Sequence, residues 1–537
     1  MIYLKDYSKL EECISEEINK ESSLLQSIYK ETGDSEERVD RFAKLIDGVS
    51  QSDILVLDEN DCAAKEPFKI VTQGNKGEYW TQQYIGLLQI TSDGTKEEVF
   101  IRSRFDVNES CEFSKYMLNK ALGLKANILQ KVEPSVGRGE ILDLILAIIF
   151  AIQIARAYRK GIYRRYRTYE NNDSKLKGRI DVARHIRLNP IFNGNIAYSS
   201  REYTADNDMN RMILTAYTSL QKRQPGLMRE LEKKYTPVKD FISQLKNIMQ
   251  PASRQEARKL VQKERKKITH AVYSDWESVR KTAILILKYM GIAPEDDGTN
   301  VNGILINMNY IWERYLVQIV KEKIENKYQI EGKKLFETFF CPGQKPKKLY
   351  PDLVISDKNG PLLIIDAKYK NEWENVASNK SDKTERERED CFQIMSYMYR
   401  AKCKFGGIFC PQTKVQDDGK KSLKEYSIFD APDEKAPDEK ATDEKAIVTL
   451  FSLQINGIQG SSKEFAEEME KREDALCGEI LKKIETHEEL RNQEMKKIKD
   501  MAVFMNTNGM EVKKIAYYLN ESASRIQEWI EESSIVQ

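Results

Sequence analysis

In "YPDLVISDKNGPLLIIDAKYK", residues 350–370, Asp352, Asp366 and Lys368 stand where a buried hairpin needs apolar side chains. The pattern predicts one strand from Asp352 and a second strand after Pro361, joined by the turn "SDKNG". Side chains alternate across a strand, so Asp366 and Lys368 point to one face, which Asp352 also reaches. Burying these charges costs several kcal/mol unless a metal or counter-charges compensate. That cost favours a functional site over a turn residue beside an edge-strand ion pair.

This combination of groups suits phosphodiester hydrolysis. Two converging carboxylates and a backbone carbonyl form an all-oxygen site of the kind that Mg²⁺ prefers. The neighbouring Lys368 ammonium can orient or deprotonate a water and offset the negative charge of the transition state.

Two helices are predicted beside the hairpin. "NMNYIWERYLVQIVKEKIE", residues 307–325, is amphipathic, with Glu313 at the border of its apolar stripe. "EDCFQIMSYMYRAK", residues 389–402, places Gln393 and Tyr397 four residues apart and therefore on one face. The strand-like "FGGIFCP" follows.

Helix with Glu, strand with Asp, strand with Asp-x-Lys, helix with Gln-x-x-x-Tyr, strand: this order resembles the PD-(D/E)xK nuclease superfamily, in the branch with a Q-x-x-x-Y helix. The resemblance implies that Asp352 and Asp366 hold Mg²⁺, for which Mn²⁺ substitutes, together with the Ala367 carbonyl. It also implies that Lys368 serves the attacking water and that Glu313 completes or extends the metal site.

The same resemblance assigns roles to the second helix. Gln393 would position the water, the lysine or the phosphate. Tyr397 is either a contact to DNA or a partner, or a core residue.

A basic tract, "YRKGIYRRYRTYENNDSKLKGRIDVARHIRLNP", occupies residues 158–190 and interleaves lysines and arginines with tyrosines. It is interpreted either as a phosphate-contacting surface or as a solvated helix face with a charged loop. The candidate contacts to DNA or a partner are Arg164, Arg165, Arg167, Lys177, Arg179, His185 and Arg187.

"KLKGRIDVARHIRLNP", then "REYTADNDMNRMILTAYTSL" and the nuclease-like segment, are similar to the McrC family, the endonuclease subunit of McrBC modification-dependent restriction systems. The resemblance covers roughly residues 50–456. Arg179, Asp181, His185 and Arg187 match its motif, and His185 is expected to be a structural hydrogen-bonder. The resemblance implies two partners, DNA with modified cytosine and a McrB-like hexameric AAA+ GTPase.

The chain is predicted to be an α+β multidomain protein with a β-rich N-terminal domain, a helical middle region, an α/β nuclease core with a mixed sheet, and a helical tail. The expected parts are a helical extension (1–50), a β-rich partner-binding domain (51–135), a helical region with the basic tract (136–295), the PD-(D/E)xK core (296–456) and a charged tail (457–537). The pentad repeat "APDEKAPDEKATDEKA", residues 431–446, is interpreted as a solvated loop between two strands. The tail ends in "NGMEVKKIAYYLNESASRIQEWI", interpreted as a packing hairpin or a helix-turn-helix.

The apolar run "ILDLILAIIFAIQIA", residues 141–155, is interrupted by Asp143 and Gln153 and is too short for a membrane span, so a buried helix is expected. With 86 basic and 85 acidic side chains, net charge does not indicate a polyanionic partner. Scattered cysteines, only three histidines and no secretory signal favour a reduced, cytoplasmic protein without structural zinc.

The chain lacks a G-x-x-x-x-G-K-[ST] loop, so a nucleotide-driven motor would be a separate polypeptide. The favoured function is a Mg²⁺-dependent endonuclease subunit of a McrBC-like (type IV) system for antiviral defence. One alternative is a self-sufficient nuclease of a related restriction or mobile-element system that binds DNA through its tail. The other is a scaffold that activates an AAA+ partner, against which the intact Asp352, Asp366 and Lys368 argue.

Overall fold

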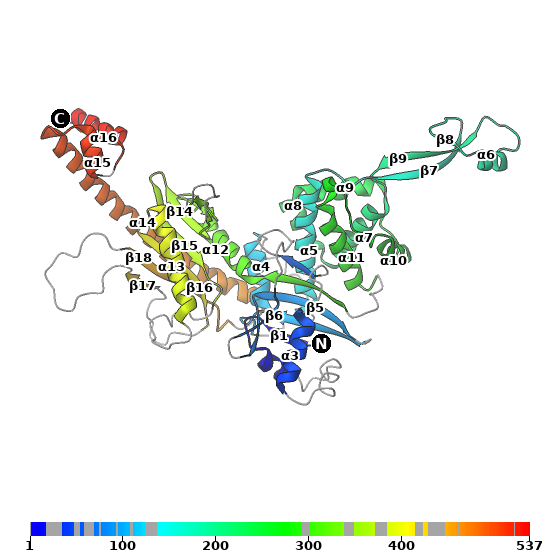
Figure 1. Ribbon diagram of the computed structural model, residues 1–537, viewed down its shortest axis with the longest axis horizontal. Coiled ribbons are helices and arrows are strands. Elements are labelled where there is room, and N and C mark those ends of the chain that lie inside the picture. Colours follow the sequence, from blue (N-terminus) through cyan, green and yellow to red (C-terminus); the bar gives the residue numbers. More distant parts are fainter. Residues whose placement is uncertain are drawn as a thin grey trace. The chain divides into compact units, whose positions relative to one another are not determined.

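The computed structural model describes residues 2–17, 35–47, 54–57, 69–74, 77–92, 95–107, 111–123, 137–292, 300–337, 348–370, 384–413, 423–427, 446–458, 461–519 and 521–536. The chain divides into two compact units, residues 1–311 with 460–463 and residues 312–459 with 464–537. Both combine helices with β-sheets (Figure 1), which confirms the predicted mixed α+β class. The helical tail belongs to the second unit, together with the sheet that precedes it.

A five-stranded sheet organises the N-terminal part of the first unit. Its order is β1 (Ile2–Lys5), β6 (Thr95–Arg102), β5 (Tyr84–Ser92), β10 (Asn300–Asn307) and β2 (Ile54–Leu57). β10, which the predicted boundary at 296 placed in the nuclease core, pairs antiparallel with β5 and parallel with β2. A Cβ on Gly86 of β5 would lie 2.0 Å from the Ile304 carbonyl oxygen, so this strand pair requires glycine there.

The described residues among the first fifty, 2–17 and 35–47, contribute a strand and two helices to this sheet and its core, whereas a helical extension had been predicted. β1 pairs parallel with β6 at the edge of the sheet. The helices α1 (Leu10–Glu17) and α3 (Ser35–Asp47) contribute Leu10, Ile14 and Phe42 to its core. Also described here are β3 (Val71–Gln73), paired with β4 (Tyr79–Thr81), and α4 (Glu112–Ala121).

The middle of the first unit contains the predicted buried helix, α5 (Gly137–Tyr158). Its two polar interruptions have partners: Asp143 Oδ2 lies 2.7 Å from Arg223 Nε, and Gln153 Oε1 accepts from Thr282 Oγ1 at 2.6 Å. None of the helices in the described ranges has the length and apolarity to span a membrane. The other elements here are α7 (Asp208–Arg223), α8 (Pro225–Lys234), α9 (Thr236–Ile248), α10 (Arg254–Lys263), the 3₁₀ helix η3 (Ala271–Tyr273) and α11 (Trp276–Tyr289).

The basic tract departs from the helical region that had been predicted. It forms a β-ribbon, here called the arm (residues 165–204), from β7 (Arg165–Asp173), β8 (Arg179–Ile180), α6 (Val182–Leu188) and β9 (Ile196–Thr204). β9 pairs antiparallel with both β7 and β8, and α6 lies at the end of the ribbon (Figure 1). Few arm side chains are buried, so the arm has little core of its own.

The second unit is built on a six-stranded mixed sheet, as predicted. The order is β11 (Gln329–Gly332), β14 (Leu353–Asp357), β15 (Gly360–Ala367), β16 (Phe405–Gln412), β18 (Ile447–Gln454) and β17 (Leu423–Ser427). β15, β16 and β18 run parallel, whereas the other pairings are antiparallel. β12 (Phe336–Glu337) and β13 (Lys348–Leu349) form a separate pair. The pentad repeat, residues 431–446, falls outside the described residues except for Ala446, and the strands on either side of it pair with each other.

Helices cover both faces of this sheet. α13 (Thr384–Ala401) packs Ile394 and Met398 on the face that carries Ile364 and Ile408. α12 (Met308–Ile324) packs on the other face, where the Trp312 ring stacks on Phe409 with ring centroids 4.5 Å apart.

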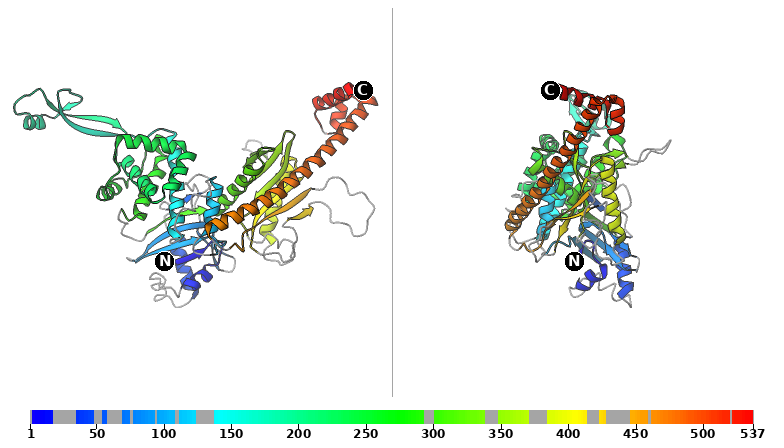
Figure 2. Two further views of the ribbon diagram at one scale, coloured as in Figure 1. Left: turned by 180° about the vertical axis from the view of Figure 1, so that it is seen from behind. Right: turned by 90° about the vertical axis from the view of Figure 1, so that its left-hand side faces the viewer.

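The tail is helical, as predicted, and comprises α14 (Ser462–Thr507), α15 (Val512–Leu519) and α16 (Ala523–Val536) (Figure 2). α15 and α16 pack through Ile515, Ile526 and Trp529. The predicted hairpin core is therefore present, whereas DNA reading by this pair stays a prediction.

We expect acid to destabilise the second unit through His487. This α14 side chain stacks on Phe405, and burial lowers its pKa from 6.5 to about 3. Between these pH values the unfolded chain binds the proton and the folded chain does not, so stability falls as the pH decreases. The expected loss at pH 5 is about 2 kcal/mol relative to pH 7. Denaturant unfolding at both pH values checks it, and His487→Phe should remove most of the difference; an unchanged difference in that variant contradicts the assignment.

Candidate active site

The two aspartates of the hairpin meet at the carboxyl end of β15. Leu353 pairs with Ile365, and this antiparallel register places Asp352 across from Asp366. The Ala367 N–H donates to Asp352 Oδ2 at 2.8 Å. Both side chains are buried, with 8% of Asp352 and 2% of Asp366 exposed. The structure therefore brings the two principal predicted site residues together.

This carboxylate pair is costly to ionise. Burial raises the pKa of Asp352 well above its usual value, and the charges of Asp366 and Glu313 raise it further. Burial also raises the pKa of Asp366, although Lys368 opposes this. A cation placed between two such carboxylates would remove much of the cost.

Lys368 is held beside the pair by several acceptors. Its Nζ lies 2.7 Å from Asp366 Oδ2 and 3.3 Å from Asp390 Oδ1, and it donates to Gln393 Oε1 at 2.7 Å. Burial lowers the pKa of Lys368, but the nearby carboxylates outweigh that effect and raise the pKa above its usual value. Lys368 is therefore an ammonium in this arrangement, suited to stabilising negative charge rather than to accepting a proton.

Gln393 and Tyr397 extend this network along α13. Gln393 Nε2 donates to the Tyr397 hydroxyl at 2.7 Å, as their four-residue spacing predicted. Tyr397 is only 4% exposed and belongs to the core under α13. Burial, with the charge of Asp366, raises its pKa to about 12, so it stays protonated. Tyr397 is accordingly a core residue that braces Gln393, and the predicted contact to DNA or a partner does not fit its burial.

Asp390 was not identified from the sequence as a site residue. It is buried, and its two carboxylate oxygens lie near different lysines, Oδ1 3.3 Å from Lys368 Nζ and Oδ2 2.7 Å from Lys370 Nζ. The available signal was spacing: Asp390 precedes Gln393 by three residues and Tyr397 by seven, which places all of them on one helix face.

Asp390→Asn is expected to slow DNA cleavage about ten- to a hundredfold, as losses of outer-shell partners do. The variant keeps the shape of the side chain but removes the charge that holds Lys368. DNA affinity should stay near wild type, because Asp390 is buried. Single-turnover cleavage and a DNA-binding titration measure the two effects. Glu389→Gln changes a neighbouring exposed acid on α13 and should cut normally; equal losses in both variants would contradict a specific role for Asp390.

Glu313 does not join the aspartates as a third ligand. Its Oε2 lies 2.8 Å from Lys333 Nζ, and the Lys333 N–H donates to the Asp352 carbonyl at 3.3 Å. In the described parts of the chain, no three His, Cys, Asp or Glu side chains gather closely enough to hold one metal ion. A role for Glu313 in extending the site stays a prediction, with Lys333 as the group that would have to move.

The predicted basic contacts are distributed along the arm. Arg165 pairs with Glu264 and Arg167 with Asp206, each at 2.6 Å, so these two also hold the base of the ribbon in place. His185 Nδ1 accepts from the Ala197 N–H at 3.3 Å, in keeping with the structural role expected of it. Five predicted contacts are exposed: Arg164, Arg167, Lys177, Arg179 and Arg187.

The arm also exposes apolar side chains that the charge-based analysis did not single out. These residues, here called the arm tip, are 50–85% exposed and comprise Val182, Ile186, Leu188, Ile191 and Phe192. A group of exposed apolar side chains beside basic ones is typical of a surface that another molecule covers.

A family model described as "McrBC 5-methylcytosine restriction system component" matches residues 80–410, more than half of the chain. The chain belongs to this family. The predicted family is thereby confirmed, and the matched range contains the arm, Glu313, the Asp352–Asp366 pair, Lys368 and Gln393.

Two solved McrBC assemblies from Thermococcus gammatolerans resemble this McrBC family member weakly. One is a half-complex from a tetradecameric assembly of McrB AAA+ hexamers with bound McrC; the identity is 15%, the match covers 88% of this chain and 99% of that chain, and the TM-score is 0.37. The other is the cryo-EM structure of the McrBC complex, at 15% identity, 61% and 89% coverage and a TM-score of 0.25. No curated protein matches the chain.

Proposed function

We propose that this McrBC component is the Mg²⁺-dependent endonuclease subunit of a type IV restriction system and hydrolyses phosphodiester bonds in foreign DNA that contains modified cytosine. The observation that carries the proposal is the buried convergence of Asp352, Asp366 and Lys368 with Gln393, in a chain of this family. The observed sheet, with α13 over the site, is compatible with a PD-(D/E)xK core.

The residues present suit a hard divalent cation. Asp352 and Asp366 offer carboxylate oxygens, and the Ala367 carbonyl is the nearest backbone oxygen in sequence. The raised pKa of both aspartates indicates a site short of positive charge, even with Lys368 in place. Bound there, Mg²⁺ or Mn²⁺ would supply Lewis-acid charge at the scissile phosphate.

The chain's own groups would then orient the reaction. The Lys368 ammonium would stabilise the negative charge that develops on the phosphate oxygens, and its contact with Gln393 fixes its direction. Gln393 is itself held by Tyr397, so the amide is positioned before substrate binds. Asp390 would keep Lys368 charged and in place.

A separate AAA+ GTPase of the McrB type is the proposed partner. The arm tip supports a partner surface on this chain, because its apolar side chains are exposed at the end of a basic ribbon. Activation of that GTPase would be a second role of the same chain and would not replace cleavage.

Plasmid cleavage in Mg²⁺ tests the proposal, with methylcytosine-containing and unmodified DNA, and with and without the partner GTPase and GTP. Wild-type cutting is expected only with modified DNA, partner and GTP together, and Asp366→Ala should abolish cutting while it retains partner binding. Partner-independent cutting would instead indicate a self-sufficient nuclease. Cutting by Asp366→Ala at the wild-type rate would leave only a scaffold role.

A further inference from the structure

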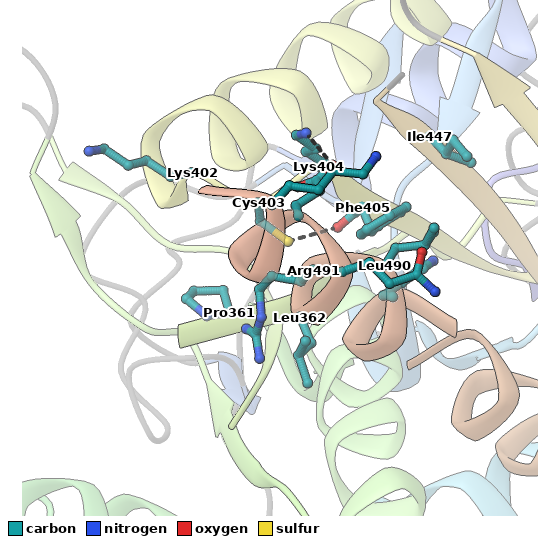
Figure 3. A pocket seen from close by; sticks show the side chains of 13 residues that line it. Pro361, Leu362, Lys402, Cys403, Lys404, Phe405, Ile447, Leu490 and Arg491 are labelled. Carbon is teal, nitrogen blue, oxygen red and sulfur yellow. Dashed lines mark hydrogen bonds and ion pairs between the residues drawn. The ribbon is translucent and has the colours of Figure 1, made fainter. Parts of the chain in front are cut away.

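Two arginines at the base of the arm carry positive charge that no acidic side chain balances. Arg164 and Arg201 are exposed, and among the described residues no carboxylate pairs with either of them. A pocket of the second unit, lined by the starts of β15 and β16 and by α14, is different (Figure 3). There Lys404 and Arg491 are each paired with a carboxylate. The base of the arm is therefore the better place for an anion to bind.

Two exposed tyrosines lie between these arginines along the ribbon. Tyr166 and Tyr203 are directly opposite each other on β7 and β9, with ring centroids 5.1 Å apart, and are 63% and 46% exposed. The Arg201 guanidinium lies over the Tyr166 ring, 4.7 Å from its centroid. Arg164 precedes Tyr166 by two residues. These four residues are here called the arm-base patch.

The helical part of the same unit holds the patch in place. The hydroxyl oxygens of Tyr203 and Tyr273 lie 2.5 Å apart, and the Tyr163 ring packs edge-on against Tyr273 with centroids 4.9 Å apart. The hydrogen bond to Tyr273 raises the pKa of Tyr203, and the charge of Arg164 acts in the opposite direction, which places that charge near the ring. Aromatic side chains that are already positioned lose little conformational freedom when a ligand binds.

The face of the ribbon that carries the patch has no unbalanced acid near it. Side chains alternate across a strand, so Glu170 shares the face of Tyr166, but it lies 3.0 Å from Arg184. Glu202 points to the other face, where it is opposite Arg167. The patch thus combines positive charge with exposed aromatic rings, the two features by which proteins hold a nucleic-acid strand.

We propose that the arm-base patch binds an unpaired strand of DNA, with bases stacked on the tyrosines and phosphates held by the two arginines. A base can lie on a tyrosine ring only when it is unstacked, whereas a duplex offers its phosphates and base edges alone. The exposed rings therefore favour a single strand over a duplex. The inference goes beyond the proposed function, because this surface lies outside the aspartate pair and its binding needs neither metal nor cleavage.

Titration of the full chain into a fluorescently labelled oligothymidylate, followed by anisotropy in a chelator, tests the role of the rings. Tyr166→Ala is expected to weaken binding of this strand about tenfold, because a base loses its stacking partner. Tyr166→Phe keeps the ring and should bind as the wild type does. Binding of the duplex that the same strand forms with oligodeoxyadenylate should change little in Tyr166→Ala.

The salt dependence of the same titration tests the arginines. The double variant Arg164→Gln and Arg201→Gln removes two phosphate contacts, so the slope of log affinity against log salt should become shallower by about 1.4. The double variant Arg229→Gln and Lys239→Gln removes two charges from exposed positions on α8 and α9 and should keep the wild-type slope. Thermal unfolding checks that both proteins remain folded.

Four results would each overturn the proposal. They are no binding of oligothymidylate, unchanged affinity in Tyr166→Ala, equal losses for the single strand and the duplex in that variant, and a wild-type salt slope in the double arginine variant. If the patch variants kept their affinity for DNA but lost the AAA+ partner, the patch would instead be part of the partner interface.

Discussion

Asp352→Asn is expected to reduce DNA cleavage about a thousandfold or more and, at the same time, to stabilise the metal-free second unit. Asparagine retains the oxygen that accepts from the Ala367 N–H but removes one of two buried like charges. Activity is lost because the remaining site holds a divalent cation poorly. Stability rises by about 1 kcal/mol because the neutral amide avoids the cost of ionising Asp352 beside Asp366. Cleavage kinetics and thermal unfolding in a chelator measure the two effects.

Asp357→Asn is the matched control, since it makes the same change at the other end of β14. Asp357 pairs with Arg491 and is distant from the aspartate pair along the strand. Its replacement should lower stability by about 1 kcal/mol, with cleavage nearly unchanged. The two replacements are expected to change stability in opposite directions, and only Asp352→Asn is expected to lose cleavage, which distinguishes a catalytic defect from a folding defect. If the Asp352→Asn variant cleaved DNA at the wild-type rate, Asp352 would not be part of the reacting centre.

The double variant Ile186→Ser and Phe192→Ser at the arm tip is expected to weaken binding of the AAA+ partner about a hundredfold. These side chains are 65% and 68% exposed, so the fold does not depend on burying them. If a partner covers them, each is a large apolar contact whose loss reduces affinity strongly. Binding of the labelled partner, measured with GTP present, gives the affinity, and partner-dependent cleavage should fall with it.

Ile248→Ser is the control for the arm, because Ile248 is 47% exposed on α9, outside the ribbon. It should leave partner affinity near the wild-type value. Unchanged affinity in the arm-tip double variant would show that the partner binds elsewhere. Loss of affinity in both proteins would point to general destabilisation, which thermal unfolding would detect.

Local sequence patterns predicted the hairpin and which of its polar side chains lie close together. The alternation in "PLLIIDAKYK" placed Asp366 and Lys368 on one face, and the helix on that side is the one that carries Gln393. The same analysis left Tyr397 open between a contact and a core residue, since a period of four residues identifies a helix face but not what covers it; its burial fits the core residue.

The arm, in contrast, was not predicted to be a β-ribbon. Its strands are short of buried side chains, so hydrophobic periodicity was absent and charge dominated the interpretation. The ribbon is held by the long ladder between β7 and β9 and by ion pairs at its base, such as Arg167 with Asp206.

The sequence by itself determined the mixed α+β class, the buried helix α5, the order of strands and helices around Asp352 and Asp366, and the McrBC family. The fold class, the helix and the order of elements follow from periodicity and spacing, which are local properties of the chain, whereas the family follows from the resemblance of its motifs. Only the tertiary structure decided that β1 and β10 join one sheet, that Asp390 shares Lys368 with Asp366, and that Lys333 holds Glu313. Those contacts join residues whose separation along the chain carries no periodic signal, so packing and charge pairing in three dimensions select them.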